Sequence, residues 1–91
     1  MTLTYATLTI DLPYAESKKS RRAVTNSIKE RLKNMNCSVL DISGEYPKEA
    51  EIALAFLSSS EQEAKRKIEK IEQMLESRFP QIEASIEFEL L

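Results

Sequence analysis

The chain opens with a strict alternation of apolar and polar residues. One face of the segment 3–12 collects Ala6, Leu8, Ile10 and Leu12, and the other collects Leu3, Tyr5, Thr7, Thr9 and Asp11. A period of two with β-branched and aromatic residues predicts a half-buried strand over 3–12. Pro13 ends this strand, because proline has no N–H group to donate to a neighbouring strand.

The next apolar residues follow helical spacing. They recur every three or four positions and form one narrow stripe: Val24, Ile28, Leu32 and Met35. This spacing predicts a helix from 18 to 35 with one buried side. Ser17 or Ser20 is suited to cap its start by accepting hydrogen bonds from free backbone N–H groups. Asn34 and Asn36 suit the left-handed conformation that closes a helix.

Two further apolar runs lie on either side of the only glycine. Residues 37–42 hold a valine, a leucine and an isoleucine, which predicts a short strand. The segment 43–48 contains Gly44 and a proline, as expected of a turn or loop. The stretch 52–57 carries no charge at all, which predicts a central strand over 50–58 with both faces covered.

The last third of the chain reads as a second helix and a final strand. Ser60 and Glu63 have the spacing of a capping box. The helix then has the buried stripe Ala64, Ile68, Ile71, Leu75 and Phe79. Its solvent side offers the ion pairs Glu61–Lys65, Glu63–Lys67 and Lys65–Glu69. Pro80 stops the helix, and residues 82–90 alternate strictly. We expect Ile82, Ala84, Ile86, Phe88 and Leu90 to point inward and Glu83, Ser85, Glu87 and Glu89 outward.

The resulting element order is β-α-β-β-α-β. Two βαβ units with right-handed crossovers predict a ferredoxin-like α+β fold, in which both helices lie on one face of a four-stranded antiparallel sheet. The whole chain, 1–91, is expected to form this single domain, with sheet order 4-1-3-2. The register of the third strand stays open, because a slip of one residue exchanges its two faces.

Composition narrows the chemistry. The 91 residues are 42% hydrophobic and 31% charged, which favours a packed core over disorder. The absence of histidine removes Ser-His, Cys-His and His-metal chemistry. Cys37, which has Lys33 within reach, cannot form an internal disulfide and is expected to be buried and structural. We therefore expect no enzyme activity, cofactor, metal or small-molecule substrate, and read the glutamates of the last strand as protection of a sheet edge.

Neither a membrane span nor a secretory signal is expected. The sequence has no run of about 18 apolar residues. The first residues lack the basic and apolar regions of a signal peptide. Together with the single cysteine, these features favour a cytoplasmic protein.

The net charge of −2 is unevenly distributed. Residues 1–40 carry seven Lys and Arg against three acids, and residues 41–91 carry six against twelve. The predicted helix over 18–35 turns one set of cations away from its buried stripe: Lys18, Lys19, Arg22, Lys29 and Lys33. These cations suit the phosphates of structured RNA, although a solvated helix face would look the same. No aromatic residue interleaves with them, so stacking on single-stranded bases is not supported.

Arg21 differs from its cationic neighbours, because it falls close to the buried stripe. A cation there needs a partner or must reach the solvent with its charged end. Asp11 or Asp41 is the expected partner, and a structural ion pair is favoured over a ligand-anchoring role.

The sheet face opposite the helices is the second candidate site. It is expected to expose mostly small, neutral residues: Tyr5, Thr7, Thr9, Ala53, Ala55, Leu57 and Ser85. Such side chains allow close approach of another sheet or helix. This pattern favours a protein-interaction surface or a homodimer interface, the alternative being a plain solvent-exposed face.

Three segments resemble the small bacterial YlxP-like family. They are the helix start Ser17-Lys18-Lys19-Ser20-Arg21-Arg22-Ala23-Val24, the strand 37–42 and the strand 50–58. The resemblance implies a ferredoxin-like fold and no established activity. It also implies a link to translation or ribosome assembly, because genes of the family often lie beside those of a translation initiation factor and a ribosome-binding factor. The chain departs from the family in the loop 43–49, which has no tryptophan, and at Ala53, where glycine is usual.

Two functional hypotheses follow from these observations. The first is a non-enzymatic accessory protein that binds structured RNA or a ribosomal subunit through the basic helix. The second is a protein-interaction or homodimerisation module that uses the open sheet face and binds no nucleic acid.

Overall fold

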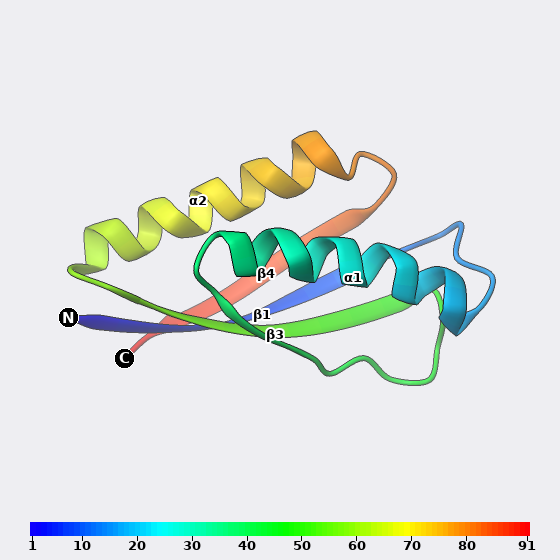
Figure 1. Cartoon of the computed structure of the whole chain (residues 1–91), viewed down its shortest axis with the longest axis horizontal. Helices are drawn as coiled ribbons and strands as arrows, with labels where there is room; N and C mark the ends of the chain where they lie inside the picture. Colours follow the sequence, from blue (N-terminus) through cyan, green and yellow to red (C-terminus); the bar gives the residue numbers. More distant parts are fainter.

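The computed structural model describes all 91 residues and has the predicted element order. The elements are β1 (Thr2–Asp11), α1 (Lys18–Asn34), β2 (Ser38–Asp41), β3 (Glu49–Ser58), α2 (Glu61–Arg78) and β4 (Glu83–Leu90). The sheet order β2-β3-β1-β4 is the predicted order read from the other edge, and all neighbours are antiparallel. Both helices cover the same face of the sheet (Figure 1). The ferredoxin-like prediction is confirmed.

The core lies between that sheet face and the two helices. Its strand residues are the inward-pointing members of the two central strands: Ala6, Leu8 and Ile10 of β1, and Ile52, Leu54 and Phe56 of β3. The helices contribute Ile28, Leu32, Ala64, Ile68, Ile71 and Leu75. Leu8 lies opposite Ile52 in the β1–β3 pair. The sequence left the register of β3 open. This pairing fixes it and places the larger side chains Ile52, Leu54 and Phe56 on the helix side, where they are buried.

The prediction that both faces of β3 are covered is wrong, and the predicted inward residues of β4 face the helices without all being buried. Only one face of β3 is covered, because both helices lie on the same side; Ala53 and Ala55 are half-buried and Leu57 is 61% exposed. The helix-facing side of β4 is also incompletely covered, because β4 lies at the sheet edge. Ala84 and Phe88 point to this side, yet both remain exposed.

Serine side chains cap the first turn of both helices, but the capping box predicted at the start of α2 does not form. Ser17 caps α1 by accepting from the Ser20 N–H, and the Ser20 hydroxyl accepts from the Ser17 N–H, so a capping box forms there. Asn36, with φ 61°, closes α1 as predicted. Ser60 caps α2 by accepting from the N–H of Glu63 at 3.2 Å. The Glu63 carboxylate accepts from the Ser59 hydroxyl instead of completing the predicted capping box.

None of the three ion pairs predicted along α2 forms. The one ion pair in the structure joins Lys18 to Glu45. Lys67 forms no ion pair with Glu63, and its Nζ lies 4.6 Å from the centroid of the Phe56 ring. Lys67 thus contacts the Phe56 ring and Glu63 accepts from the Ser59 hydroxyl, although their helical spacing would allow them to pair with each other.

Candidate nucleic-acid interface

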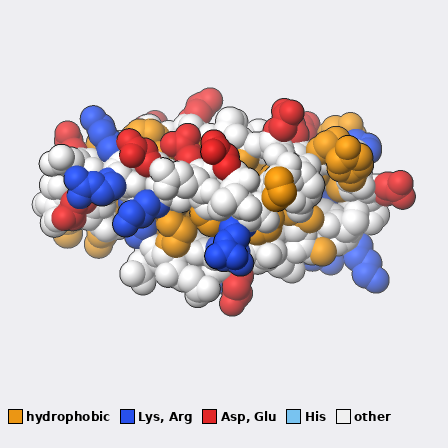
Figure 2. All heavy atoms as spheres, turned by 90° about the horizontal axis from the view of Figure 1, so that it is seen from above, with side chains coloured by type: hydrophobic (Ala, Val, Ile, Leu, Met, Phe, Trp, Pro, Cys, Tyr) orange, Lys and Arg blue, Asp and Glu red, His pale blue; other side chains and the backbone are white.

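Charge is segregated between the two layers of the fold. Of the 13 Lys and Arg residues, seven lie in α1, five in α2 and one, Lys48, in the β2–β3 loop. The strands contain no cation and seven acids. α1 has a single acid, Glu30, whereas α2 has five. Figure 2 looks onto the helix layer and shows its Lys and Arg side chains, several of them at the end where α2 begins. The largest excess of positive charge therefore belongs to α1.

The α1 basic stripe consists of the predicted residues Lys18, Lys19, Arg22, Lys29 and Lys33. Its members Lys19, Arg22 and Lys33 are exposed, and Lys29 is half-buried. At about 1.5 Å per residue, Lys19 and Lys33 are separated by about 21 Å along the helix. Of these residues, Lys29 acts on β2, because its charge helps to lower the pKa of the Asp41 carboxyl.

Lys18 is held by the β2–β3 loop rather than left free. Its amino group forms the ion pair and hydrogen bond with Glu45. This hydrogen bond lowers the pKa of Glu45, with the charge of Lys18 adding to the effect. The other four members of the stripe have no carboxylate partner within 4.0 Å, so they are the cations available to an anion from outside.

Arg21 has a structural role, but the prediction that it forms an ion pair with Asp11 or Asp41 is wrong. The side chain is only 9% exposed, and its Nη1 donates to three carbonyl oxygens. These belong to Gly44 at 2.9 Å, Tyr46 at 2.8 Å and Glu49 at 3.0 Å. The reason is the path of the β2–β3 loop, which brings its carbonyls to the first turn of α1. Arg21 thus fastens this loop to the helix.

The open sheet face contains all seven predicted residues. Tyr5 pairs with Ala55, and Thr7 with Ala53. Thr9 pairs with Ser85 in β4. Alternation places Leu57 on the same side, although it lies at the end of β3.

Two exposed leucines enlarge the open sheet face beyond the predicted set. Leu3, 40% exposed, lies opposite Leu57, and Leu40, 65% exposed, lies opposite Ala53. The alternation of the first strand already placed Leu3 there. Leu40 requires the β2–β3 register, which the sequence does not provide. Glutamates border this patch at Glu51, Glu87 and Glu89.

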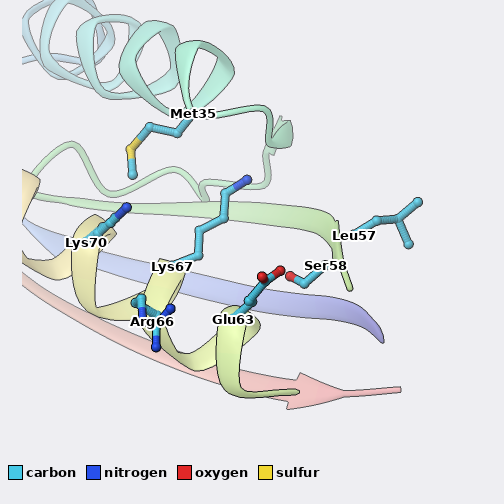
Figure 3. Close-up of a pocket in the computed structure, with 7 residues that line it drawn as sticks. All are labelled: Met35, Leu57, Ser58, Glu63, Arg66, Lys67 and Lys70. Carbon is cyan, nitrogen blue, oxygen red and sulfur yellow. The ribbon is translucent and has the colours of Figure 1, made fainter. Parts of the chain in front are cut away.

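A groove that the sequence did not reveal lies where the end of α1, the end of β3 and the start of α2 meet. Its volume is about 490 Å³. Seven residues line it: Met35, Leu57, Ser58, Glu63, Arg66, Lys67 and Lys70 (Figure 3). The one available signal was the spacing of Arg66, Lys67 and Lys70 on one flank of a helix. Nothing in the sequence placed Met35 or Leu57 beside them.

Cys37 is buried as expected, at 6% exposure. Burial raises the pKa of its thiol, and the positive charge of Lys67 opposes part of that rise. The cation that acts on the thiol is Lys67 of α2, whereas the sequence had placed Lys33 within reach. A thiol with a raised pKa is a weak nucleophile at neutral pH.

Two further features of the structure bear on function. No group of three or more His, Cys, Asp or Glu side chains is arranged to hold a metal ion. The helices are too short or too polar for any of them to cross a membrane.

Comparisons with known proteins bear on the fold and the family. No curated protein matches the sequence. The de novo designed protein Foldit4 matches with a TM-score of 0.59 and 12% identity, covering 98% of this chain and 97% of its own. The de novo designed protein LFR1 1, with ferredoxin fold, has a TM-score of 0.53 and 16% identity, covering 99% and 85%. At these identities the likeness shows the fold alone. The model of the family described as "Protein of unknown function (DUF503)" matches residues 3–87, and the chain therefore belongs to that family.

Proposed function

We propose that this protein is a non-enzymatic accessory protein of the cytoplasm that binds structured RNA of a ribosomal subunit through the α1 basic stripe. The observation that carries the proposal is a row of four cations without carboxylate partners, in a helix with a single acid. Phosphate contacts supply most of the affinity in such complexes and need no enclosed pocket.

The form of α1 suits double-stranded or folded RNA better than single strands. Structured RNA is recognised by shape and by contacts to phosphates and 2′-hydroxyls. The stripe contains no aromatic residue on which a base could stack. Apart from Asp41, the acids of the strands point to the sheet face opposite the helices. Salt screens charges that are separated by more than the Debye length of about 8 Å, so the local charge of α1 governs binding.

The resemblance to the YlxP-like family supports a ribosomal target. One of the three segments that carry the resemblance is the helix start from Ser17 to Val24, which contains the first cations of the stripe. The genes of that family lie near those of translation factors, and this association narrows the RNA to the translation machinery. Membership of a family of unknown function is compatible with this proposal.

A salt titration of binding to purified small ribosomal subunits tests the proposal. The wild type is compared with Arg22→Glu/Lys33→Glu, which inverts two exposed cations of the stripe. Lys65→Glu/Arg78→Glu is the matched control, because it makes the same change of charge on α2 outside the groove. Circular dichroism first establishes that all three proteins fold.

We expect the binding constant of the wild type to fall with salt, by about 0.9 log units per log unit of salt for each phosphate contacted. The stripe variant should lose binding at least tenfold, roughly the effect of losing one hydrogen bond to a charged group, and the control should retain it. Absence of binding, or equal binding by both variants, would refute the role of the stripe.

The open sheet face supports a second candidate function, a homodimer or protein-interaction interface without nucleic acid. Three observations favour it: Leu40 and Leu57 are more than half exposed, the adjoining alanines permit close packing, and no strand carries a cation. Light scattering tests the homodimer. A mass near twice 10.4 kDa that falls to the monomer on Ala55→Arg would support it. A strict monomer at high concentration would rule the homodimer out.

A further inference from the structure

The groove beside α2 combines charge with an apolar wall. Arg66, Lys67 and Lys70 line it from α2, and Met35 reaches it from the end of α1 (Figure 3). Leu57 lies at the rim of the groove, at the end of β3, with its side chain pointing away from Met35. The volume of about 490 Å³ lies within the range of roughly 300–1,000 Å³ that is usual for small-ligand sites.

The three cations of the groove have no carboxylate bound to them. None of them lies within 4.0 Å of an acid, although α2 contains five acids. Glu63 is the single acid in the lining, and its carboxylate accepts from the Ser59 hydroxyl. Lys67 extends over the ring of Phe56, which holds its amino group in the groove. A site with this excess of donors and positive charge is complementary to an anion.

We infer that this groove binds a phosphate-bearing ligand of nucleotide size. The phosphate would bind Arg66, Lys67 and Lys70, because guanidinium and ammonium groups supply the charge-assisted hydrogen bonds that phosphate oxygens accept. The base would pack against the side chain of Met35. The site shares no residue with the α1 basic stripe, so the inference does not depend on the proposed function. The same phosphate chemistry is offered by a free nucleotide and by a nucleotide of an RNA chain.

Amide NMR titrations at low salt test the site with AMP, adenosine and a single-stranded RNA tetranucleotide. The groove variant is Arg66→Ala/Lys70→Ala. The control variant, Lys65→Ala/Arg78→Ala, removes the same charge from the same helix outside the groove. A third protein, Arg22→Glu/Lys33→Glu, separates this site from the α1 basic stripe.

We expect AMP to shift the amides of Ser58 and Lys67 and to bind the groove variant at least about tenfold more weakly. The control and stripe variants should bind AMP like the wild type. A groove-dependent response to the tetranucleotide without one to AMP would also support the site and assign its phosphate to RNA. Equal binding of adenosine and AMP, equal weakening by the control variant, or no response to either phosphate compound would overturn the inference.

Discussion

α1 and the open sheet face lie on opposite sides of the same sheet and have opposite charge. α1 carries seven cations and one acid. On the open side, alternation and register collect six strand acids and no cation: Asp11, Glu49, Glu51, Glu83, Glu87 and Glu89. The net charge of −2 therefore describes neither surface. The helix side is suited to anions, and the sheet side repels them while exposing leucines.

The cations of α1 differ from one another in their surroundings. Arg21 is buried under the β2–β3 loop, Lys18 is paired with Glu45, and Arg22 is exposed without a carboxylate partner. A variant that removes a structural cation weakens the fold, whereas one that removes a free cation changes only the surface charge. Substitutions at neighbouring positions separate these two effects.

The largest effect is expected at Arg21. Arg21→Ala removes the donor to two carbonyls of the β2–β3 loop and to the Glu49 carbonyl at the start of β3, and should lower the free energy of unfolding by about 3 kcal/mol. Arg22→Ala, one residue further along, should change it by no more than about 0.5 kcal/mol. Urea unfolding followed by circular dichroism measures both. Equal losses for the two variants would contradict the structural role of Arg21.

The two faces of β1 provide the next contrast. The hydroxyl of Thr4 is fully buried and has no hydrogen-bond partner. Thr4→Val replaces it with a methyl group of similar shape and should stabilise the protein by about 1–2 kcal/mol. Thr9→Val, on the open sheet face, should change stability by less than about 0.5 kcal/mol. Thermal unfolding compares them, and a destabilised Thr4→Val would indicate that the buried hydroxyl has a partner.

The cap of α1 gives a smaller effect on the same helix as the basic stripe. Ser17→Ala removes the acceptor for the Ser20 N–H at 3.1 Å and should cost about 1 kcal/mol. Ser27→Ala, at an exposed position inside α1, should be neutral or slightly stabilising, because alanine is the better helix former. Urea unfolding of both variants checks the difference. Equal stabilities would show that the helix start is held by the packing of the first turn alone.

The fold was predictable because its strands alternate without ambiguity in two places. Residues 3–12 and 82–90 each place their apolar residues on one face, so both the strands and their core sides follow from a period of two. The middle strand is different. Residues 52–57 are apolar on both faces, and only packing against α1 and α2 selects the face with the larger side chains.

The candidate sites were predictable only where they lie on a single element. The α1 basic stripe follows from 3.6 residues per turn, because all five cations belong to one helix. The partners of Lys18 and Arg21 depend on the path of the loop 43–48, which no periodicity describes. The groove joins Met35 to residues 57–70, and such a juxtaposition of distant segments exists only in the folded chain.

Asp41 is the one strand acid on the helix side of the sheet. Its ionisation therefore reports on how far the positive charge of α1 extends toward the sheet. It lies opposite Ile52, and its Oδ1 accepts from the Ser43 N–H at 2.9 Å. Burial acts to raise the pKa of Asp41, but hydrogen bonds from Ser43 and the charges of Lys29 and Arg21 outweigh it and lower the pKa below 3.8. A carboxyl whose pKa is lower in the folded state stabilises the protein above its ordinary pKa and loses that contribution as the pH falls through the folded value.

Asp41→Asn keeps the oxygen that accepts from Ser43 and removes only the charge. We expect it to lower stability at pH 7 by about 0.5 kcal/mol, since solvent screens this exposed group. The difference from the wild type should shrink as the pH falls through 3.8 and vanish once the folded carboxyl is protonated. Urea unfolding across this range measures the effect. A difference that persists at low pH would mean that the side chain acts through the shape of the turn, and that the field of α1 does not extend to the sheet beneath it.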